Sequence, residues 1–196
     1  MLKIIVLLCA LLPSLATAGL LEKANIDIVS VTVSEDENGA NVCGLLINAV
    51  REGSGSDRFA GFNGSINLAS KGAALIKGRH TNIKVINRGK AEPEVKLVTV
   101  PSTYVWFKVD GSKRTRPVQA VRKSRDDYAL YVSNFEVAGE IIAGIFSDKV
   151  LSIGTTRESD DMEVIYYGKP VIEKDVAERF TACMDEMLKA SDSVEK

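Results

Sequence analysis

The side chains in this sequence that could support thiol, metal or nucleophilic chemistry are few. The 196-residue chain contains three cysteines and one histidine. Cys9 lies in an apolar segment near the start, whereas Cys43 and Cys183 are far apart and form no C-x-x-C or metal-ligand spacing. In an oxidising compartment, such a distant pair indicates a structural disulfide rather than a catalytic thiol. We therefore predict a Cys43–Cys183 bond between an early strand and the last helix, and no metal site.

The oxidising compartment is inferred from residues 1–18, MLKIIVLLCALLPSLATA. A lysine, an apolar run and small residues up to Ala18 are typical of a cleaved secretory signal peptide. The run is too short to span a bilayer comfortably. Leu8 is bulky where a lipidation motif needs a small residue, which disfavours lipid attachment at Cys9. We expect a periplasmic or secreted protein without a transmembrane segment, with residues 19–196 forming a single globular domain.

Catalytic patterns are sparse. His80 is the only histidine, which excludes a multi-histidine metal site and leaves one candidate base for a triad. We expect it to be a polar surface or turn residue. Ser65 and Ser70 lack the G-x-S-x-G context of a nucleophile. Acid pairs at 126–127 and 160–161 could serve glycoside hydrolysis, but ESDDME lacks the ligand spacing of a calcium loop, and adjacent acids in turns are more often solvated. We expect no enzymatic activity and no cofactor, with a hydrolase as the least favoured alternative.

The most unusual charge feature is the run KVDGSKRTRPVQAVRKSR at 108–125, in which only Asp110 offsets seven cations. Folded as a hairpin, it would gather positive charge that attracts an acidic protein, anionic lipid or polymer. The alternative is a solvated loop whose cations offset acids elsewhere. The net charge of −1 and the exported destination argue against nucleic-acid binding. The candidate binding residues are the aromatic Trp106 and the cations Lys113, Arg114, Arg116, Arg122, Lys123 and Arg125.

These candidates must be positioned by a mostly β framework. Residues 26–50 alternate apolar and polar around the turn EDENG, which predicts a hairpin, and the glycine-rich stretch 51–64 predicts a loop. Further strand-like runs follow at regular spacing. Helical periodicity appears at 135–149 and again at 173–189, where Cys183 lies in the apolar stripe. We predict an α+β, mainly β fold: an antiparallel β-sandwich or barrel-like sheet with one short helix and a C-terminal helix packed on it.

The C-terminal half also carries a family resemblance. The segments YVWFKVDG, EIIAGIFSDKVLSIGT, YYGKP and AERFTACMDEM, within 104–188, resemble small secreted bacterial proteins related to invasion-associated locus B. Chains of that family commonly end in a strand, a glycine, here Gly168, and a short helix carrying a cysteine. The resemblance implies a non-catalytic β-sandwich that acts by protein contact, as inhibitors and immunity factors do.

Together these observations predict an exported, non-enzymatic protein that binds another macromolecule, in the manner of an inhibitor or immunity-type protein. The expected surface of contact is the basic run at 108–125. The alternative is a small-ligand or lipid-binding module, which would require an apolar cavity between the β-layers.

Overall fold

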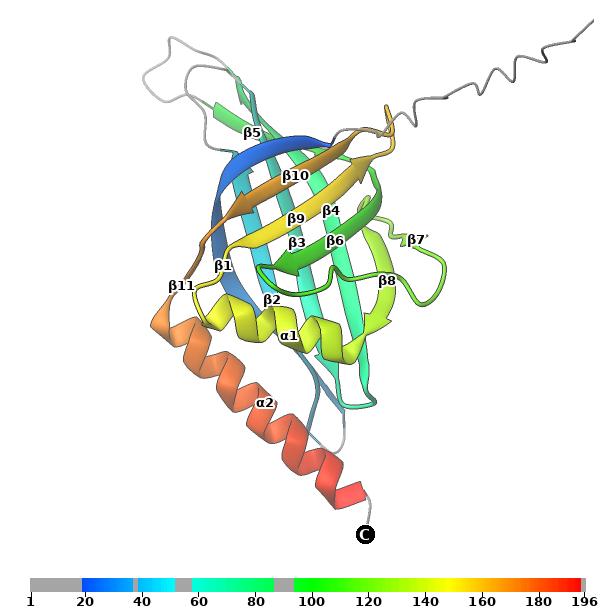
Figure 1. Cartoon of the computed structure of the whole chain (residues 1–196), viewed down its shortest axis with the longest axis vertical. Coiled ribbons are helices and arrows are strands. Elements are labelled where there is room, and N and C mark those ends of the chain that lie inside the picture. Colours follow the sequence, from blue (N-terminus) through cyan, green and yellow to red (C-terminus); the bar gives the residue numbers. More distant parts are fainter. Residues whose placement is uncertain (1–18, 37–38, 52–57, 87–93, 195–196) are drawn as a thin grey trace, which may run out of the picture.

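The computed structural model describes residues 19–36, 39–51, 58–86 and 94–194, so the predicted signal peptide lies outside the described residues. The described part is one large, mostly antiparallel, strongly curved open sheet of 11 strands with two helices packed on it (Figure 1). The predicted mainly β, α+β fold is therefore confirmed. The elements are β1 (Leu20–Asp36), β2 (Gly39–Arg51), β3 (Arg58–Ala69), β4 (Ala73–Ile86), β5 (Glu94–Val100), β6 (Ser102–Val109), β7 (Arg122–Lys123), β8 (Ala129–Asn134), α1 (Phe135–Phe146), β9 (Leu151–Arg157), β10 (Glu163–Gly168), β11 (Pro170–Ile172) and α2 (Lys174–Val194).

Strand β1 joins the two halves of the sheet. The order is β6-β9-β10-β1-β2-β3-β4-β8-β7, with β11 beside β1 and β5 beside β4. The first residues of β1, Leu20–Lys23, run parallel to β10, and the rest forms the predicted antiparallel hairpin with β2. Ala24, Ile26 and Ile28 are buried at alternate positions, as expected for a strand with one face toward a core.

Strand β3 corrects one prediction. The loop expected over 51–64 is wrong from Arg58 onward, because these residues form the start of β3. Two glycines obscure the strand pattern there, yet Gly64 has a packing reason: a Cβ at this position would collide with the Phe62 ring. That ring meets Phe107 edge-on in the core, with centroids 5.5 Å apart.

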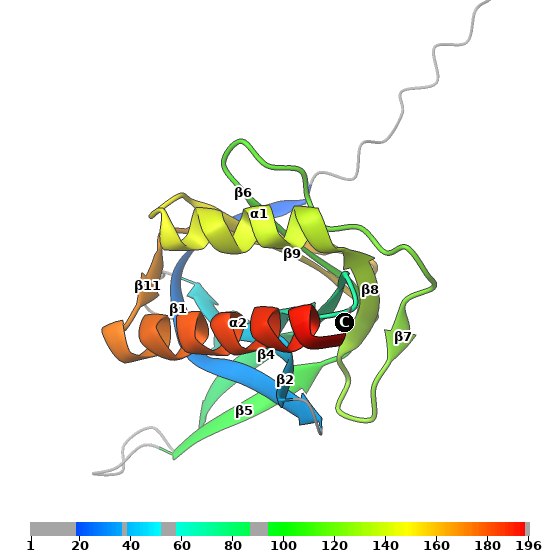
Figure 2. The same ribbon diagram turned by 90° about the horizontal axis from the view of Figure 1, so that it is seen from below.

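Helix α1 is the predicted short helix, and it lies across one end of the curved sheet (Figures 1 and 2). Asn134 caps it, because its side chain accepts a hydrogen bond from the Val137 N–H at 3.0 Å. Ile141 and Ile145 are buried on its core-facing side. Gly144 sits against Val109, so a larger residue there would push the helix off the sheet.

Helix α2 is the predicted C-terminal helix, starting one residue later than the predicted Glu173 and continuing to Val194. Phe180 and Met187 are buried in its apolar stripe together with Cys183, and the helix packs mainly on β2. The predicted disulfide is confirmed: Cys43 and Cys183 are bonded, with their Cα atoms 5.9 Å apart. The bond fixes α2 to the far part of the β1–β2 hairpin.

We expect this disulfide to contribute strongly to stability. It closes a loop with a sequence separation of 140 residues, for which the chain-entropy model gives about 5 kcal/mol. Cys43→Ser and Cys183→Ser should lower the free energy of unfolding by similar amounts, and the double variant should add little to either. Denaturant titration without a reductant measures the free energy of unfolding of the wild type and the three variants. Clearly unequal or additive losses would contradict a shared bond.

Candidate functional site

The candidate site lies where the curved sheet does not close, between β6 and β8. One edge of β4 has two partners: β8 pairs with Ala73–Gly78, and β5 pairs with His80–Ile86. Pro101, which has no backbone N–H, separates β5 from β6, and β6 then pairs with β9. In the described part of the chain, no strand ladder joins β6 to β8. We call this gap the seam.

Residues 110–118, which we call the seam segment, run through this gap. A tight turn brings the chain back from the end of β6, with the Ser112 N–H donating to the Val109 carbonyl at 3.0 Å. Gly111 in this turn has φ +85°, a conformation that glycine adopts without strain. The Ser112 hydroxyl accepts from the Val109 N–H, also at 3.0 Å. The turn therefore satisfies both backbone groups at the end of β6.

Thr115 anchors the middle of the seam segment. It is completely buried, its N–H donates to the Phe107 carbonyl at 2.9 Å, and its hydroxyl accepts from the Phe107 N–H at 3.0 Å. The same hydroxyl lies 2.8 Å from the Tyr131 hydroxyl of β8. Beyond it, the Val118 N–H donates to the Val132 carbonyl at 2.9 Å. The segment thus bonds to β6 on one side and to β8 on the other.

Exposed cations lie on both sides of the buried threonine. Lys113, Arg114 and Arg116 of the seam segment and Lys108 of β6 are all exposed, and they line a pocket of about 630 Å³. In the described residues, none of these four forms an ion pair. The lining of this seam pocket contains no carboxylate and consists of Lys108, Ser112, Lys113, Arg114, Arg116, Pro117, Val118, Ser133, Asn134 and Val137.

Trp106 is buried next to Arg114 rather than exposed to solvent. Its exposed fraction is 6%, and its indole N–H donates to Glu163 Oε1 at 2.7 Å. The ring lies against Gly154, which leaves no space for a side chain. The Arg114 guanidinium lies 5.7 Å from the ring centroid, within the range of a cation–π contact. Trp106 is therefore a platform for Arg114.

The pKa of Tyr104 is affected by the positive charge at the seam. Burial raises the pKa of its hydroxyl above the ordinary value, while the nearby guanidinium groups of Arg114 and Arg116 oppose that rise. The hydroxyl donates to the Thr115 carbonyl at 3.3 Å. Two positive charges therefore act on the same point of the seam.

The remaining predicted cations form a separate group. Arg122 and Lys123 make up β7, and with Glu158 they line another pocket of about 270 Å³. Lys123 is paired with Glu158 at 2.5 Å and with Asp127 at 3.8 Å. Arg125 is exposed and lines neither pocket. The structure thus divides the basic run into an unpaired set around the seam pocket and a partly neutralised set around β7.

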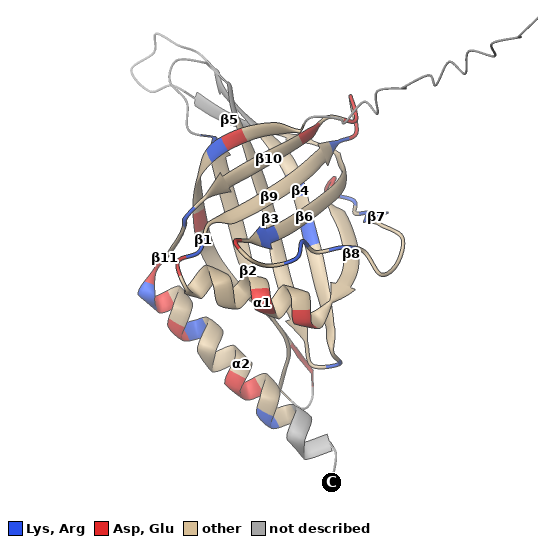
Figure 3. Ribbon diagram, in the orientation of Figure 1, with Lys and Arg blue, Asp and Glu red and all other residues tan. Residues whose placement is uncertain are grey.

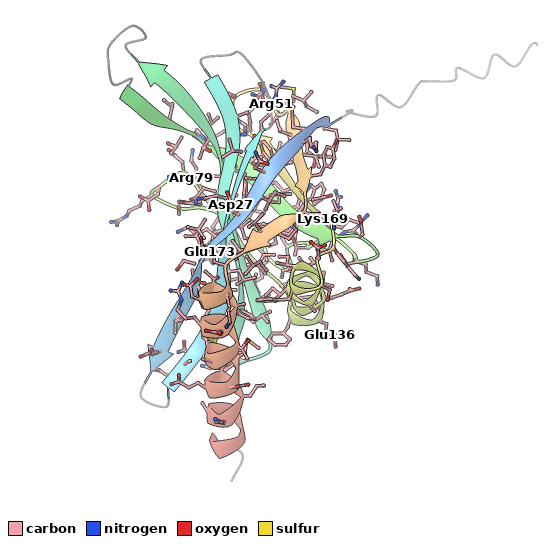
Figure 4. The ribbon with its side chains drawn as sticks, turned by 90° about the vertical axis from the view of Figure 1, so that its left-hand side faces the viewer. Asp27, Arg51, Arg79, Glu136, Lys169 and Glu173 are labelled. Atoms are coloured by element: carbon pink, nitrogen blue, oxygen red, sulfur yellow. A yellow bond between two sulfur atoms is a disulfide. The ribbon has the colours of Figure 1, made fainter. Side chains whose placement is uncertain are left out.

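His80 lies inside the sheet, so its predicted place at the surface or in a turn is wrong. It belongs to β4, is 1% exposed, and its Nδ1 lies 2.9 Å from the Tyr166 hydroxyl. Because strand residues alternate between faces, His80 points inward while its neighbour Arg79 points outward (Figure 4). The Ser102 hydroxyl accepts from the His80 backbone N–H at 2.9 Å, so this serine contacts the backbone of the histidine.

The acid pairs lie in turns. Asp127 has φ +64° between β7 and β8, and Asp161 has φ +51° between β9 and β10. The Asp160 carboxylate is paired with Arg157 at 2.6 Å. Within the described ranges, no group of three or more His, Cys, Asp or Glu residues could hold a metal ion.

Comparison with known proteins gives no family: no protein-family model, curated protein or solved structure matches the chain. The resemblance over 104–188 therefore remains a prediction. Among the described residues, no helix has the length and apolar character needed to cross a membrane.

Sequence reasoning missed the uncharged half of the site. Ser133, Asn134 and Val137 reach the pocket from β8 and α1, and nothing local links them to the basic run. Asn134 before an apolar helical pattern is the one available signal, since it is a typical N-cap. Thr115 carries no sequence signal of its anchoring role, because its partners come from two other strands.

We expect Thr115→Val to loosen the seam segment. The substitution leaves the buried Phe107 N–H without an acceptor and should cost about 1–3 kcal/mol of unfolding free energy. Thr103→Val is the matched control, because Thr103 is exposed and its hydroxyl makes one long bond of 3.4 Å. Hydrogen exchange should accelerate at residues 112–118 in the first variant only. Unchanged exchange in Thr115→Val would contradict the anchoring role.

The Tyr131 hydroxyl should make the protein sensitive to alkali. It donates to the Val105 carbonyl at 2.8 Å, and burial raises its pKa well above the ordinary value of 10.0. The folded state favours the neutral Tyr131 hydroxyl. The contribution of this group to the free energy of unfolding is therefore complete below pH 10.0 and is lost as the pH rises above it. In alkaline denaturant titrations, Tyr131→Phe should lose stability with pH less steeply than the wild type. Identical slopes would refute this.

Proposed function

We propose that this protein is an exported, non-enzymatic binding protein that recognises an acidic site on a protein partner through the seam pocket. One observation carries the proposal: in the described residues, four cations without an ion pair line a pocket that has no carboxylate in its lining. Three of them, Lys113, Arg114 and Arg116, stand on a segment bonded to strands on both sides. In Figure 3, blue Lys and Arg positions follow β6 on the loop between β6 and α1.

Gathering like charges costs free energy, and the fold does not relieve that cost here. Mutual repulsion among neighbouring cations destabilises the compact state, and an anionic partner removes the repulsion on binding. Arginine suits this task because its planar guanidinium can donate two parallel hydrogen bonds to one carboxylate. Arg114 is further oriented by its contact with Trp106. The cations are therefore arranged for an external anion.

Two further features support an exported protein without chemistry of its own. The Cys43–Cys183 disulfide is consistent with an oxidising location outside the cytoplasm. His80 is buried away from the seam pocket, and Asp160 is engaged by Arg157 in a turn. Neither of these candidate acid–base groups contributes to the lining of the pocket.

A small anionic ligand is the second candidate, and the pocket volume favours it. About 630 Å³ lies within the roughly 300–1,000 Å³ of small-molecule sites. The site would be the seam pocket and not the sheet interior, where Phe62, Phe107 and Tyr166 are among the largest buried side chains. Native mass spectrometry of the protein purified from the periplasm discriminates the two, since a retained small anion would appear as added mass.

Charge reversal at the pocket tests the function. Wild-type protein should capture a partner from periplasmic extract, and Arg114→Glu/Arg116→Glu should lose that partner. Arg122→Glu is the control because it makes one such charge reversal in the same basic run outside the seam pocket. Since all three residues are exposed, thermal unfolding should be nearly unchanged. A partner captured equally by every variant, or no retained partner, would count against the proposal.

A further inference from the structure

A second pocket continues the seam pocket toward the turn between β3 and β4. Its volume is about 460 Å³, and it shares Val118, Ser133 and Asn134 with the seam pocket, so the two are contiguous. Its other walls are Gly72, Ala73, Val132, Phe135 and Glu136. We call the two pockets together the seam groove.

The two ends of the groove differ in charge. The seam pocket has four cations, whereas the second pocket has none and includes one carboxylate, Glu136. Apolar surface is available at the junction, because Val118 is 62% exposed. Its backbone is fixed by the bond to Val132, which holds the side chain at the boundary. A ligand that fits the whole groove is therefore acidic at one end and apolar at the other.

Resting on the function proposed above, we infer that the seam groove binds an extended segment of the protein partner with several acidic side chains next to an apolar one. The acidic side chains lie among Lys113, Arg114 and Arg116, and the apolar side chain lies against Val118. An extended chain suits the groove because successive side chains can occupy its two parts in turn.

The shape and the surrounding charges favour this occupant over a membrane or a free phosphate. A bilayer presents a flat anionic surface, whereas these cations line a concavity. Glu136 is exposed on α1 and lines the groove, where an anionic lipid surface would repel it (Figure 4). A single phosphate could engage the cations but would leave the second pocket and Val118 uncovered.

Synthetic peptides with blocked ends test the inference. The peptides Glu-Glu-Glu-Glu-Leu-Leu and Leu-Leu-Glu-Glu-Glu-Glu are each compared with the same peptide carrying serine in place of leucine. Calorimetry gives affinity, and the fluorescence of Trp106, the one tryptophan of the chain, reports events at Arg114. The better leucine peptide should bind about tenfold more tightly than its serine counterpart, because part of a leucine side chain is buried.

Three variants assign the effect to the groove. Arg114→Glu/Arg116→Glu should lower the affinity for every acidic peptide about tenfold or more. Val118→Ser should remove the advantage of leucine while leaving the affinity for the serine peptide unchanged. Arg122→Glu should change neither affinity. Val118 is exposed, so its substitution should leave folding intact.

Inorganic phosphate and phosphatidylglycerol vesicles serve as competing probes. Tighter binding of either probe than of the peptides, or equal affinity for the leucine and serine peptides, overturns the inference. The proposed function is judged separately by partner capture. If a partner depends on Arg114 and Arg116 while no peptide shows the leucine effect, the function stands and the acidic–apolar segment is wrong.

Discussion

The free edge of β6 is the constraint around which the seam is built. A buried backbone N–H or C=O without a partner costs about 1–3 kcal/mol, and an unprotected edge also invites pairing with other chains. Strand β6 pairs with β9 along one edge, and among the described residues no strand pairs with its other edge. The seam segment satisfies the edge instead, through Thr115 and the turn at Ser112.

This solution has a direct consequence for the surface. Neighbouring residues of an extended segment point to opposite sides. Burying Thr115 therefore directs Arg114 and Arg116 outward, where both are exposed. Arg114 and Arg116 therefore stand on a backbone that is bonded to β6 and β8, and little backbone conformational entropy remains to be lost when an anion binds. The Arg114 contact with the Trp106 ring adds further order. The seam segment thus protects the edge of β6 and also presents an ordered basic surface.

The two helices lie together at one end of the curved sheet (Figures 1 and 2). Helix α1 starts directly after β8, so its cap residue Asn134 forms a wall of the groove. Helix α2 covers the extension of the β1–β2 hairpin, and the disulfide keeps it there. The two helices meet where Phe146 lies against Phe180, with ring centroids 5.3 Å apart. The wall of the groove is therefore supported by the same core that the disulfide stabilises.

The sequence by itself determined the local elements and the covalent link. Alternation predicted the β1–β2 hairpin, and helical spacing predicted α1 and α2. A predicted signal peptide together with two distant cysteines predicted the Cys43–Cys183 bond. The hairpin and the helices depend on residue patterns that a short window contains, whereas the bond follows from the number of cysteines and the compartment. Only the tertiary structure decided that His80 faces inward, that Arg58 onward is strand, and that the basic run divides in two. Each of these depends on which strands become neighbours, and that is set by packing between segments far apart in the chain, as at Thr115, whose partners lie on β6 and β8.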